Sequence, residues 1–400
     1  MRAITRPLSA YADGPVDLND IAGGDGVLFV RNAIGVAGRG VAATVPVDDA
    51  AAFLADLDHD STVPGAGPVA LGCVPFVPGS PADVVVPTVQ FRKDAAGVTT
   101  VTLVGDADEE VVRDALRRRD PAAATAASWS IRPAVDVDDY LTAVAAARDA
   151  VRAGDLTKAV IARPIVVQSS EAIDVHAVLR RLRGSFGSSY RYSIDGFIGA
   201  SPELLVEVDG PVVRSHPLAG TAPRTGDVDN DARIAAELIA STKNQIEHRV
   251  VIDVVHDTLL PWASYLDWEP DPSIVTVANV QHLGTRMEGM LSQPGPSVIE
   301  LVRALSPTPA LGGHPRDPAI ELIQRVEGFE RGRYGGAVGW VDAAGNGTWA
   351  VAIRCAELSD DRRSARLVAG GGIVADSDPH AELAETQAKF QAMLSAIVRP

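Results

Sequence analysis

Four lysines are the first residues in this 400-residue chain whose chemistry stands out: Lys93, Lys158, Lys243 and Lys389. Lysine and arginine together number 36, so the other 32 are arginine. Arginine stays protonated in proteins, whereas a desolvated lysine can lose its proton and act as a base. A GC-rich codon bias is the simplest explanation of the low lysine count, but it does not explain the positions. Three of the four lie beside carboxylates or in glycine- and strand-rich segments, which makes them candidates for one active site.

Two helix-like segments carry polar side chains at helical spacing. Asn244 and Glu247 share one face of the first, and Glu382 and Glu385 share one face of the second, with Lys389 four residues after Glu385. Surface ion pairing is the alternative for either helix. Carboxylates without clustered histidine or cysteine suit a hard cation such as Mg²⁺.

Three consecutive glycines, Gly370 to Gly372, precede the second acidic segment. A glycine turn there would let backbone N–H groups approach an anion closely. An ordinary tight turn is the alternative. No Gly-Lys-Ser/Thr follows, so a phosphate-binding loop is not expected.

The elements that must position these residues follow from hydrophobic periodicity. The sequence predicts a strand buried on both faces over 158–168, a strand over 197–208, a long helix from 229 to about 260 and a final helix over about 379–397. Strands greatly outnumber strand–helix–strand alternations. We therefore expect large antiparallel sheets with helices packed outside, not a doubly wound sheet.

A glycine-rich stretch near the N-terminus lies between strand-like segments at 27–30 and 41–45. Gly35, Gly38 and Gly40 do not follow the order of a dinucleotide-binding loop, so a hairpin turn is predicted.

The overall composition limits the classes of binding partner that we expect. With 46% apolar residues the chain can form one large domain or two. A net charge of −16 argues against nucleic acid and requires any anion site to be locally positive. Cys73 and Cys355 give neither a disulfide framework nor a zinc spacing. There is no secretory signal and no apolar run near the ~18 residues of a membrane helix, so we expect no membrane association and a cytoplasmic protein.

Taken together, eight motifs in order closely resemble the chorismate-utilising enzymes, which include the isochorismate, salicylate, anthranilate and aminodeoxychorismate synthases. They are FIGASPELL (197–205), PLAGTAPR (217–224), KNQIEH (243–248), VQHLGT (280–285), LSPTPALGG (305–313), YGGAVGW (334–340), AVAIR (350–354) and the segment 369–389. The resemblance implies one chorismate-binding domain over 1–400, with 1–130 a variable part that completes the sheets and 136–400 the motif-bearing core. It implies an α+β fold, a four-layer α/β/β/α sandwich of two large antiparallel sheets with helices outside.

The resemblance also implies a Mg²⁺ cofactor. Glu247 and Glu385 match its carboxylate ligands, and Glu382 matches a neighbouring, water-mediated one. Asn244 departs from many relatives, which carry an acid there, and this weakens the expected support of the metal.

The substrate contacts carry over in two groups. Tyr334 and Arg354 match residues that hold the enolpyruvyl carboxylate, aided by backbone N–H groups near Gly370 and Gly372. A second set would lie at the ring: Gly220 and Thr221 near its carboxylate, Lys389 close by, and His282 against the ring. A structural histidine is an equal alternative for His282.

Two positions separate the chemistries within the family. Lys158 stands where water-activating members place lysine and aminating ones glutamine, and Ala219 stands where aminodeoxychorismate synthases can place a nucleophilic lysine. The resemblance therefore implies an isochorismate synthase, in which Lys158 activates water for attack on C2 and Glu203 protonates the departing C4 hydroxyl. A desolvated lysine and a buried glutamate suit these two tasks.

Salicylate synthase, which goes on to eliminate pyruvate, shares these residues and is the leading alternative. Anthranilate synthase is disfavoured by Lys158, and a non-catalytic chorismate-binding relative by the intact base and acid. The expected partner is chorismate alone, without a glutaminase subunit, in a monomer. Menaquinone and siderophore pathways both stay open.

Overall fold

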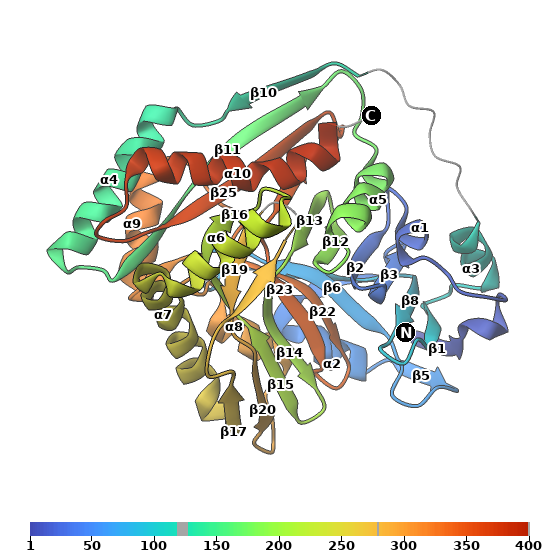
Figure 1. Ribbon diagram of the computed structural model, residues 1–400. Helices are drawn as coiled ribbons and strands as arrows, with labels where there is room; N and C mark the ends of the chain where they lie inside the picture. The colour runs from blue at the N-terminus through green and yellow to red at the C-terminus, as the bar shows by residue number, and fades with distance from the viewer. Residues whose placement is uncertain (118–126, 278–279, 399–400) are drawn as a thin grey trace.

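Two large β-sheets form the centre of the molecule (Figure 1). The computed structural model describes residues 1–117, 127–277 and 280–398. The larger sheet runs in the order β10 (Trp129–Pro133), β11 (Lys158–Ser169), β25 (Ser364–Ile373), β24 (Cys355–Leu358), β13 (Phe197–Ser201), β12 (Tyr190–Ile194), β2 (Val27–Arg31), β3 (Ile34–Arg39), β8 (Val89–Lys93), β9 (Thr99–Val104), β1 (Arg2–Pro7) and β5 (Asp58–Ser61), with β21 (Gly313–His314) paired to β11.

The second sheet has nine strands and a third, small sheet has three. The nine are β17 (Ala263–Trp268), β20 (Met287–Leu291), β15 (Val212–His216), β14 (Leu204–Asp209), β23 (Gly347–Val351), β22 (Ala337–Asp342), β6 (Val69–Val74), β7 (Asp83–Val86) and β4 (Ala43–Pro46). The small sheet contains β16 (Leu218–Pro223), β19 (Val280–Gly284) and β18 (Ser273–Thr276). Strands from the first hundred residues complete both large sheets.

The helices lie outside the sheets. They are α1 (Leu18–Ala22), α2 (Ala50–Ala55), α3 (Glu109–Leu116), α4 (Val137–Ala153), α5 (Val175–Phe186), α6 (Val228–Ala240), α7 (Thr242–Leu259), α8 (Val298–Leu305), α9 (Arg316–Val326) and α10 (Pro379–Val398). Apolar side chains of α1, α3, α5 and α10 pack on the larger sheet, and those of α2 and α8 on the nine-stranded one. Between the sheets lies a shared core that includes Tyr192 from one and Leu71 from the other. None of the described helices combines the length and apolar character needed to span a bilayer.

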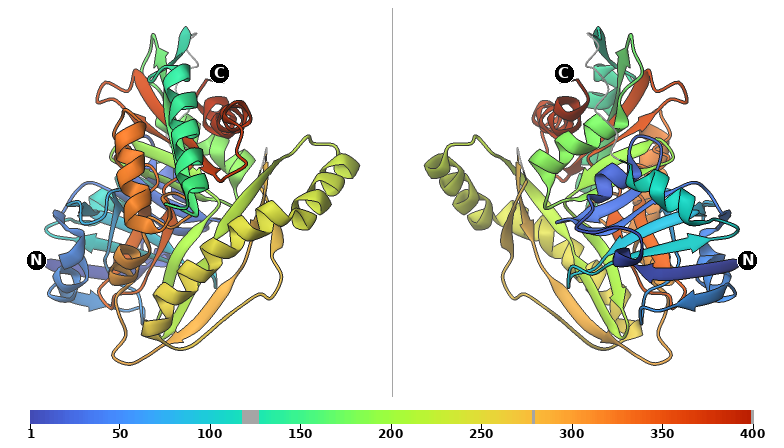
Figure 2. Two further views of the ribbon diagram at one scale, coloured as in Figure 1. Left: turned by 90° about the vertical axis from the view of Figure 1, so that its left-hand side faces the viewer. Right: turned by 90° about the vertical axis from the view of Figure 1, so that its right-hand side faces the viewer.

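The predicted α+β class, with two large sheets between helices, is confirmed. The pairing is almost entirely antiparallel; within the described residues only β1 and β5 run parallel. The small third sheet was not predicted. It packs with α6 and α7 into an arm that stands out from the sandwich (Figure 2).

Proline explains why one predicted strand is wrong. The segment expected as a single strand over 197–208 is divided into β13 and β14, which belong to different sheets, and the break falls at Pro202 and Glu203. Pro217 likewise separates β15 from β16. Proline lacks the N–H that a strand ladder requires, so the chain can change sheets at these points.

The single long helix predicted from 229 to 260 is also wrong. The chain leaves the helical conformation at Ser241, whose side chain accepts a hydrogen bond from the backbone N–H of Asn244 and so caps α7. This break separates the exposed α6 from α7, which carries Glu247.

Two glycine turns were predicted, and the structure differs from both predictions. The three glycines at 370–372 lie within β25 and pair with β11. Neither an anion-binding turn nor an ordinary tight turn is therefore present there. The hairpin expected near the N-terminus is present between β2 and β3, but residues 32 and 33 make its reversal, while Gly35 and Gly38 lie within β3. Gly40, whose φ is 66°, lies in the bend after β3.

Candidate active site

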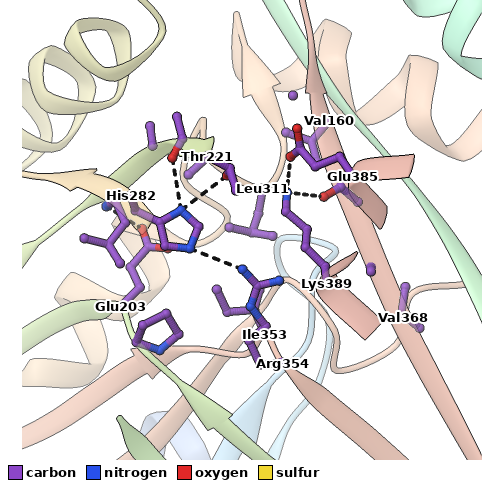
Figure 3. Close-up of a pocket in the computed structure, with 18 of the residues that line it drawn as sticks. Val160, Glu203, Thr221, His282, Leu311, Ile353, Arg354, Val368, Glu385 and Lys389 are labelled. Carbon is purple, nitrogen blue, oxygen red and sulfur yellow. Dashed lines mark hydrogen bonds and ion pairs between the residues drawn. The ribbon is translucent and has the colours of Figure 1, made fainter. Parts of the chain in front are cut away.

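One cavity of about 240 Å³ lies between the arm and the larger sheet. It is lined by every residue assigned a site role from the sequence, namely Lys158, Glu203, Gly220, Thr221, Glu247, His282, Tyr334, Arg354, Gly370, Gly372, Glu382, Glu385 and Lys389. Figure 3 shows Glu203, His282, Arg354, Glu385 and Lys389 converging on it. The structure thus brings the set together, while the role of each member stays a prediction.

Lysine rarity was a useful signal for residues at this cavity. Lys243 was given no role from the sequence, yet it lines the opening from the first turn of α7, beside Asn244. The scarcity of lysine in this chain is the signal that could have identified Lys243 as a site residue. Lys93, by contrast, ends β8 and is not among the lining residues.

Lys158 begins β11, and its side chain is only 3% exposed. Its ammonium group donates a hydrogen bond of 2.7 Å to Glu247 Oε1 on α7. This ion pair connects the sandwich to the arm across the cavity. Any group that engaged Glu247 Oε1 instead would release the lysine.

Glu203 occupies the break between β13 and β14, where the chain passes from one sheet to the other. Its carboxyl group is buried, and Oε1 accepts a hydrogen bond from the backbone N–H of Leu218 at 3.3 Å. Burial raises the pKa of Glu203 to about 8, outweighing that hydrogen bond and the charges of Lys158 and Arg354. At neutral pH Glu203 is therefore a protonated acid that can donate a proton.

His282 on β19 is held in one tautomer. Arg354 Nη2 lies 3.2 Å from Nε2, and a guanidinium can only donate, so Nε2 accepts. Nδ1 then carries the proton and donates to the carbonyl of Gly220 at 3.0 Å. Burial, followed by the charge of Arg354, lowers the pKa of His282 to about 3, so the ring is neutral. His282 fits both roles considered for it. It lines the cavity, as a ring-contacting residue would, and both of its nitrogens have protein partners, as in a structural histidine.

Arg354 has unused hydrogen-bonding capacity. Its side chain is buried, its backbone φ is 51°, and its Nε has no partner. A left-handed backbone at a large residue is costly and is typical of functional positions. Tyr334 is buried in the same wall, and burial raises the pKa of its hydroxyl, which stays neutral. Together they offer donors to an anion.

The acidic face of α10 borders the same space. Lys389 forms an ion pair of 2.6 Å with Glu385 and donates to the carbonyl of Gly370 at 2.7 Å. Burial alone would raise the pKa of Glu385, but the charge and hydrogen bond of Lys389 outweigh it and hold the pKa low. Glu382 accepts a hydrogen bond from Ser377 at one oxygen, and its buried Oε2 has no partner. Burial and then Glu385 raise the pKa of Glu382 to about 7.

The glycines of β25 make room for these carboxylates. A Cβ at Gly371 would lie 2.6 Å from Glu382 Oε2, and one at Gly372 would lie 2.7 Å from Glu247 Oε1. Across the described residues, no three His, Cys, Asp or Glu side chains stand close enough to hold a metal ion by themselves. Mg²⁺ usually takes only one or two protein carboxylates and completes its shell with water and substrate. The unpartnered oxygen and the glycine gap fit such a partial site.

Comparison with known proteins identifies the family. The family model described as chorismate binding enzyme matches residues 49–398. The chain belongs to this family. It is 41% identical over 281 residues to the isochorismate synthase DhbC of Bacillus subtilis, covering 68% of this chain and 70% of that protein. It is 34% identical over 354 residues to the isochorismate synthase EntC of Escherichia coli, covering 86% and 84%.

The fold of this chorismate-binding enzyme matches solved structures as well. The menaquinone-specific isochorismate synthase MenF from Escherichia coli superposes with a TM-score of 0.84 over 99% of this chain and 94% of that one, at 24% identity. Such a likeness shows the fold. Two predictions are therefore confirmed: the chain belongs to the chorismate-utilising family, and it is an isomerase of the isochorismate synthase kind.

Proposed function

We propose that this enzyme is a Mg²⁺-dependent isochorismate synthase, which adds water at C2 of chorismate and removes the C4 hydroxyl. The observation that carries the proposal is one cavity holding a buried lysine and a protonated, buried glutamate, Lys158 and Glu203. A base and an acid of these two kinds are what a water-for-hydroxyl exchange requires.

The residues then act in sequence. Lys158 takes a proton from a water molecule whose oxygen bonds to C2. The ring double bonds shift, the C4–oxygen bond breaks, and Glu203 gives its proton to the departing hydroxyl, which leaves as water. One water enters and one leaves, so the product is an isomer of chorismate.

Arg354 and Tyr334 would bind the enolpyruvyl carboxylate. The partnerless Nε of Arg354 supports this role, because a guanidinium recognises a carboxylate through parallel N–H groups. The neutral His282 fixes that guanidinium through its Nη2 and would pack against the ring.

The charge of the cavity supports a metal requirement. Four cationic side chains line it, Lys158, Lys243, Arg354 and Lys389, but two of them are already in ion pairs, Lys158 with Glu247 and Lys389 with Glu385. These ion pairs reduce the attraction of the cavity for a dianion. Glu247 and Glu385, with Glu382 nearby, would hold Mg²⁺, which supplies positive charge for the ring carboxylate. Engagement of Glu247 would also free Lys158 from its ion pair.

Product analysis tests the proposal. Purified protein with chorismate and Mg²⁺ should yield isochorismate alone by chromatography, and a chelator should abolish the conversion. Salicylate with pyruvate would show that the reaction continues past isochorismate. Absence of turnover in both conditions would overturn the proposal.

Variants test the two roles. Lys158→Ala and Glu203→Gln should each lose ~10²-fold or more of the rate while remaining folded. Lys93→Ala removes a lysine outside the cavity and should leave the rate unchanged. A near-normal rate in either cavity variant would remove the role assigned to that residue.

A further inference from the structure

A second cavity, of about 380 Å³, lies on the opposite, outer face of the larger sheet. It is enclosed by α1 with the loop before it, the C-terminal end of α5, and strands β2 and β12, which neighbour one another in Figure 1. Its opening is formed by Asn32, Ala33 and Arg183, and its buried floor by Leu18, Asn19, Val30 and Arg191. None of these residues lines the chorismate cavity.

Arg191 is the unusual member of this floor. Its side chain is 1% exposed, and Nη1 donates to Asn19 Oδ1 at 2.6 Å. Nε is buried without a partner, and no hydrogen bond of Nη2 is found within the described residues. Burial, followed by the charge of Arg183, lowers the pKa of Arg191 to about 10, so the group is still a cation at neutral pH.

The surrounding carboxylates do not balance this cation. Asp17 accepts hydrogen bonds from the backbone and side-chain amides of Asn19 and forms an ion pair with Arg183. The carboxylate of Asp17 therefore lies near two guanidinium groups. It pairs directly with Arg183, whereas Arg191 is connected to it only through the side-chain amide of Asn19. Burying a charge without a counterion is strongly unfavourable. Because the chain has a net charge of −16, this local positive charge does not follow from a generally positive surface.

We propose that this cavity binds a small monoanionic carboxylate with an apolar body, as a second ligand site separate from the chorismate cavity. Arg191 lines the cavity and its Nε has no partner, so its Nε–Nη2 edge would offer two parallel N–H groups, which match the two oxygens of a carboxylate. One uncompensated charge matches a monoanion better than a phosphate. Val16, Leu18 and Val30 supply apolar walls, and the volume lies within the ~300–1,000 Å³ usual for ligand sites.

Benzoate is a suitable probe, because it carries one carboxylate on a compact apolar ring. Calorimetric titration should show saturable binding to the wild-type enzyme and to Arg354→Met, which disables the main anion donor of the chorismate cavity. Arg191→Met should weaken binding by roughly tenfold or more. Arg113→Met removes an exposed arginine on α3 and is the matched control for net charge, with binding unchanged. Binding lost in Arg354→Met but kept in Arg191→Met, or no binding to wild type, would overturn the proposal.

A thermal measurement separates a ligand site from a merely structural arginine. Without benzoate, Arg191→Met should melt at or above the wild-type temperature, because it removes a buried unpaired charge. Benzoate should raise the melting temperature of the wild type and not that of the variant. A lower melting temperature for the variant together with no effect of benzoate on the wild type would assign Arg191 a structural role only. If Arg191→Met does not fold, Val16→Trp fills the cavity with the arginine in place and should abolish benzoate binding; unchanged binding there contradicts the site.

Discussion

Glu203 is the residue whose environment most changes its chemistry. An exposed glutamate is ionised at neutral pH, whereas this one keeps its proton because the side chain is buried where the chain crosses between sheets. The acid of the proposed reaction is therefore produced by its position in the fold. Two measurements follow from the direction of its pKa shift.

The first concerns the rate. The acid must be protonated, and its pKa is about 8, so kcat/KM should fall by about tenfold per pH unit above that value. A pH–rate profile measured with saturating Mg²⁺ checks this. A profile that stays flat to pH 10 would contradict the role of Glu203 as the proton donor.

The second concerns folding stability. The folded protein keeps the Glu203 proton up to pH about 8, while the unfolded chain loses it near the ordinary value of 4.5. Stability should therefore fall as pH rises between these values, by on the order of 3–5 kcal/mol, relative to a variant with no titrating group there. Glu203→Gln is that variant, and denaturant unfolding at pH 5 and pH 8 measures the difference. An equal change for both proteins would show that Glu203 does not titrate in this range.

Strand β25 is the element that shapes the carboxylate face of the site. Gly372→Ala would place a methyl group 2.7 Å from Glu247 Oε1 and 2.8 Å from Lys158 Cε. Displacement of these groups should lower kcat/KM by on the order of 10²-fold. Gly184→Ala is the matched control, since its Cβ meets nothing within 4 Å on α5, and it should leave activity intact and add ~0.5–1 kcal/mol of stability. Equal activity of the two variants would contradict the crowding argument.

Strand β25 also shows which features can be predicted from local sequence and which cannot. Periodicity within a segment was enough to predict β11 and α10, because burial and helical spacing are local properties. The turn predicted at the glycines of β25 was wrong, since the side chains that need the room beside this strand come from α7 and α10, which are remote in sequence.

Breaks inside two predicted elements were missed for a related reason. Apolar residues recur on both sides of Pro202 and of Ser241, so the sequence was interpreted as one strand and one helix, although the chain changes sheet or helix there. Glu203 was identified by resemblance to a family, not by periodicity, and its burial became evident only with the sheet crossing. The rarity of lysine made Lys243 a candidate but gave it no role, because its place at the opening depends on how the arm folds.

At the scale of the whole molecule, the site lies between two units. The arm contributes Gly220, Thr221, Glu247 and His282, and the sandwich contributes the remaining assigned residues. Chorismate with Mg²⁺ should therefore slow amide hydrogen exchange in β16 and in the first turns of α7, because a ligand that binds both units opposes their local opening. Mass spectrometry of exchange with and without both ligands checks this, and β6, remote from the cavity, is the internal reference. Exchange that slows equally in β6 would indicate general stabilisation instead of bridging.

The pairing of β11 with β25 has a consequence for the synthesis of the protein. Val160 lies opposite Gly372, so the strand that carries Lys158 must wait for a partner made more than two hundred residues later. Contacts of such long range form late in folding. A ribosome must therefore release almost the entire chain before the cavity can exist, and a nascent or prematurely terminated enzyme cannot consume chorismate.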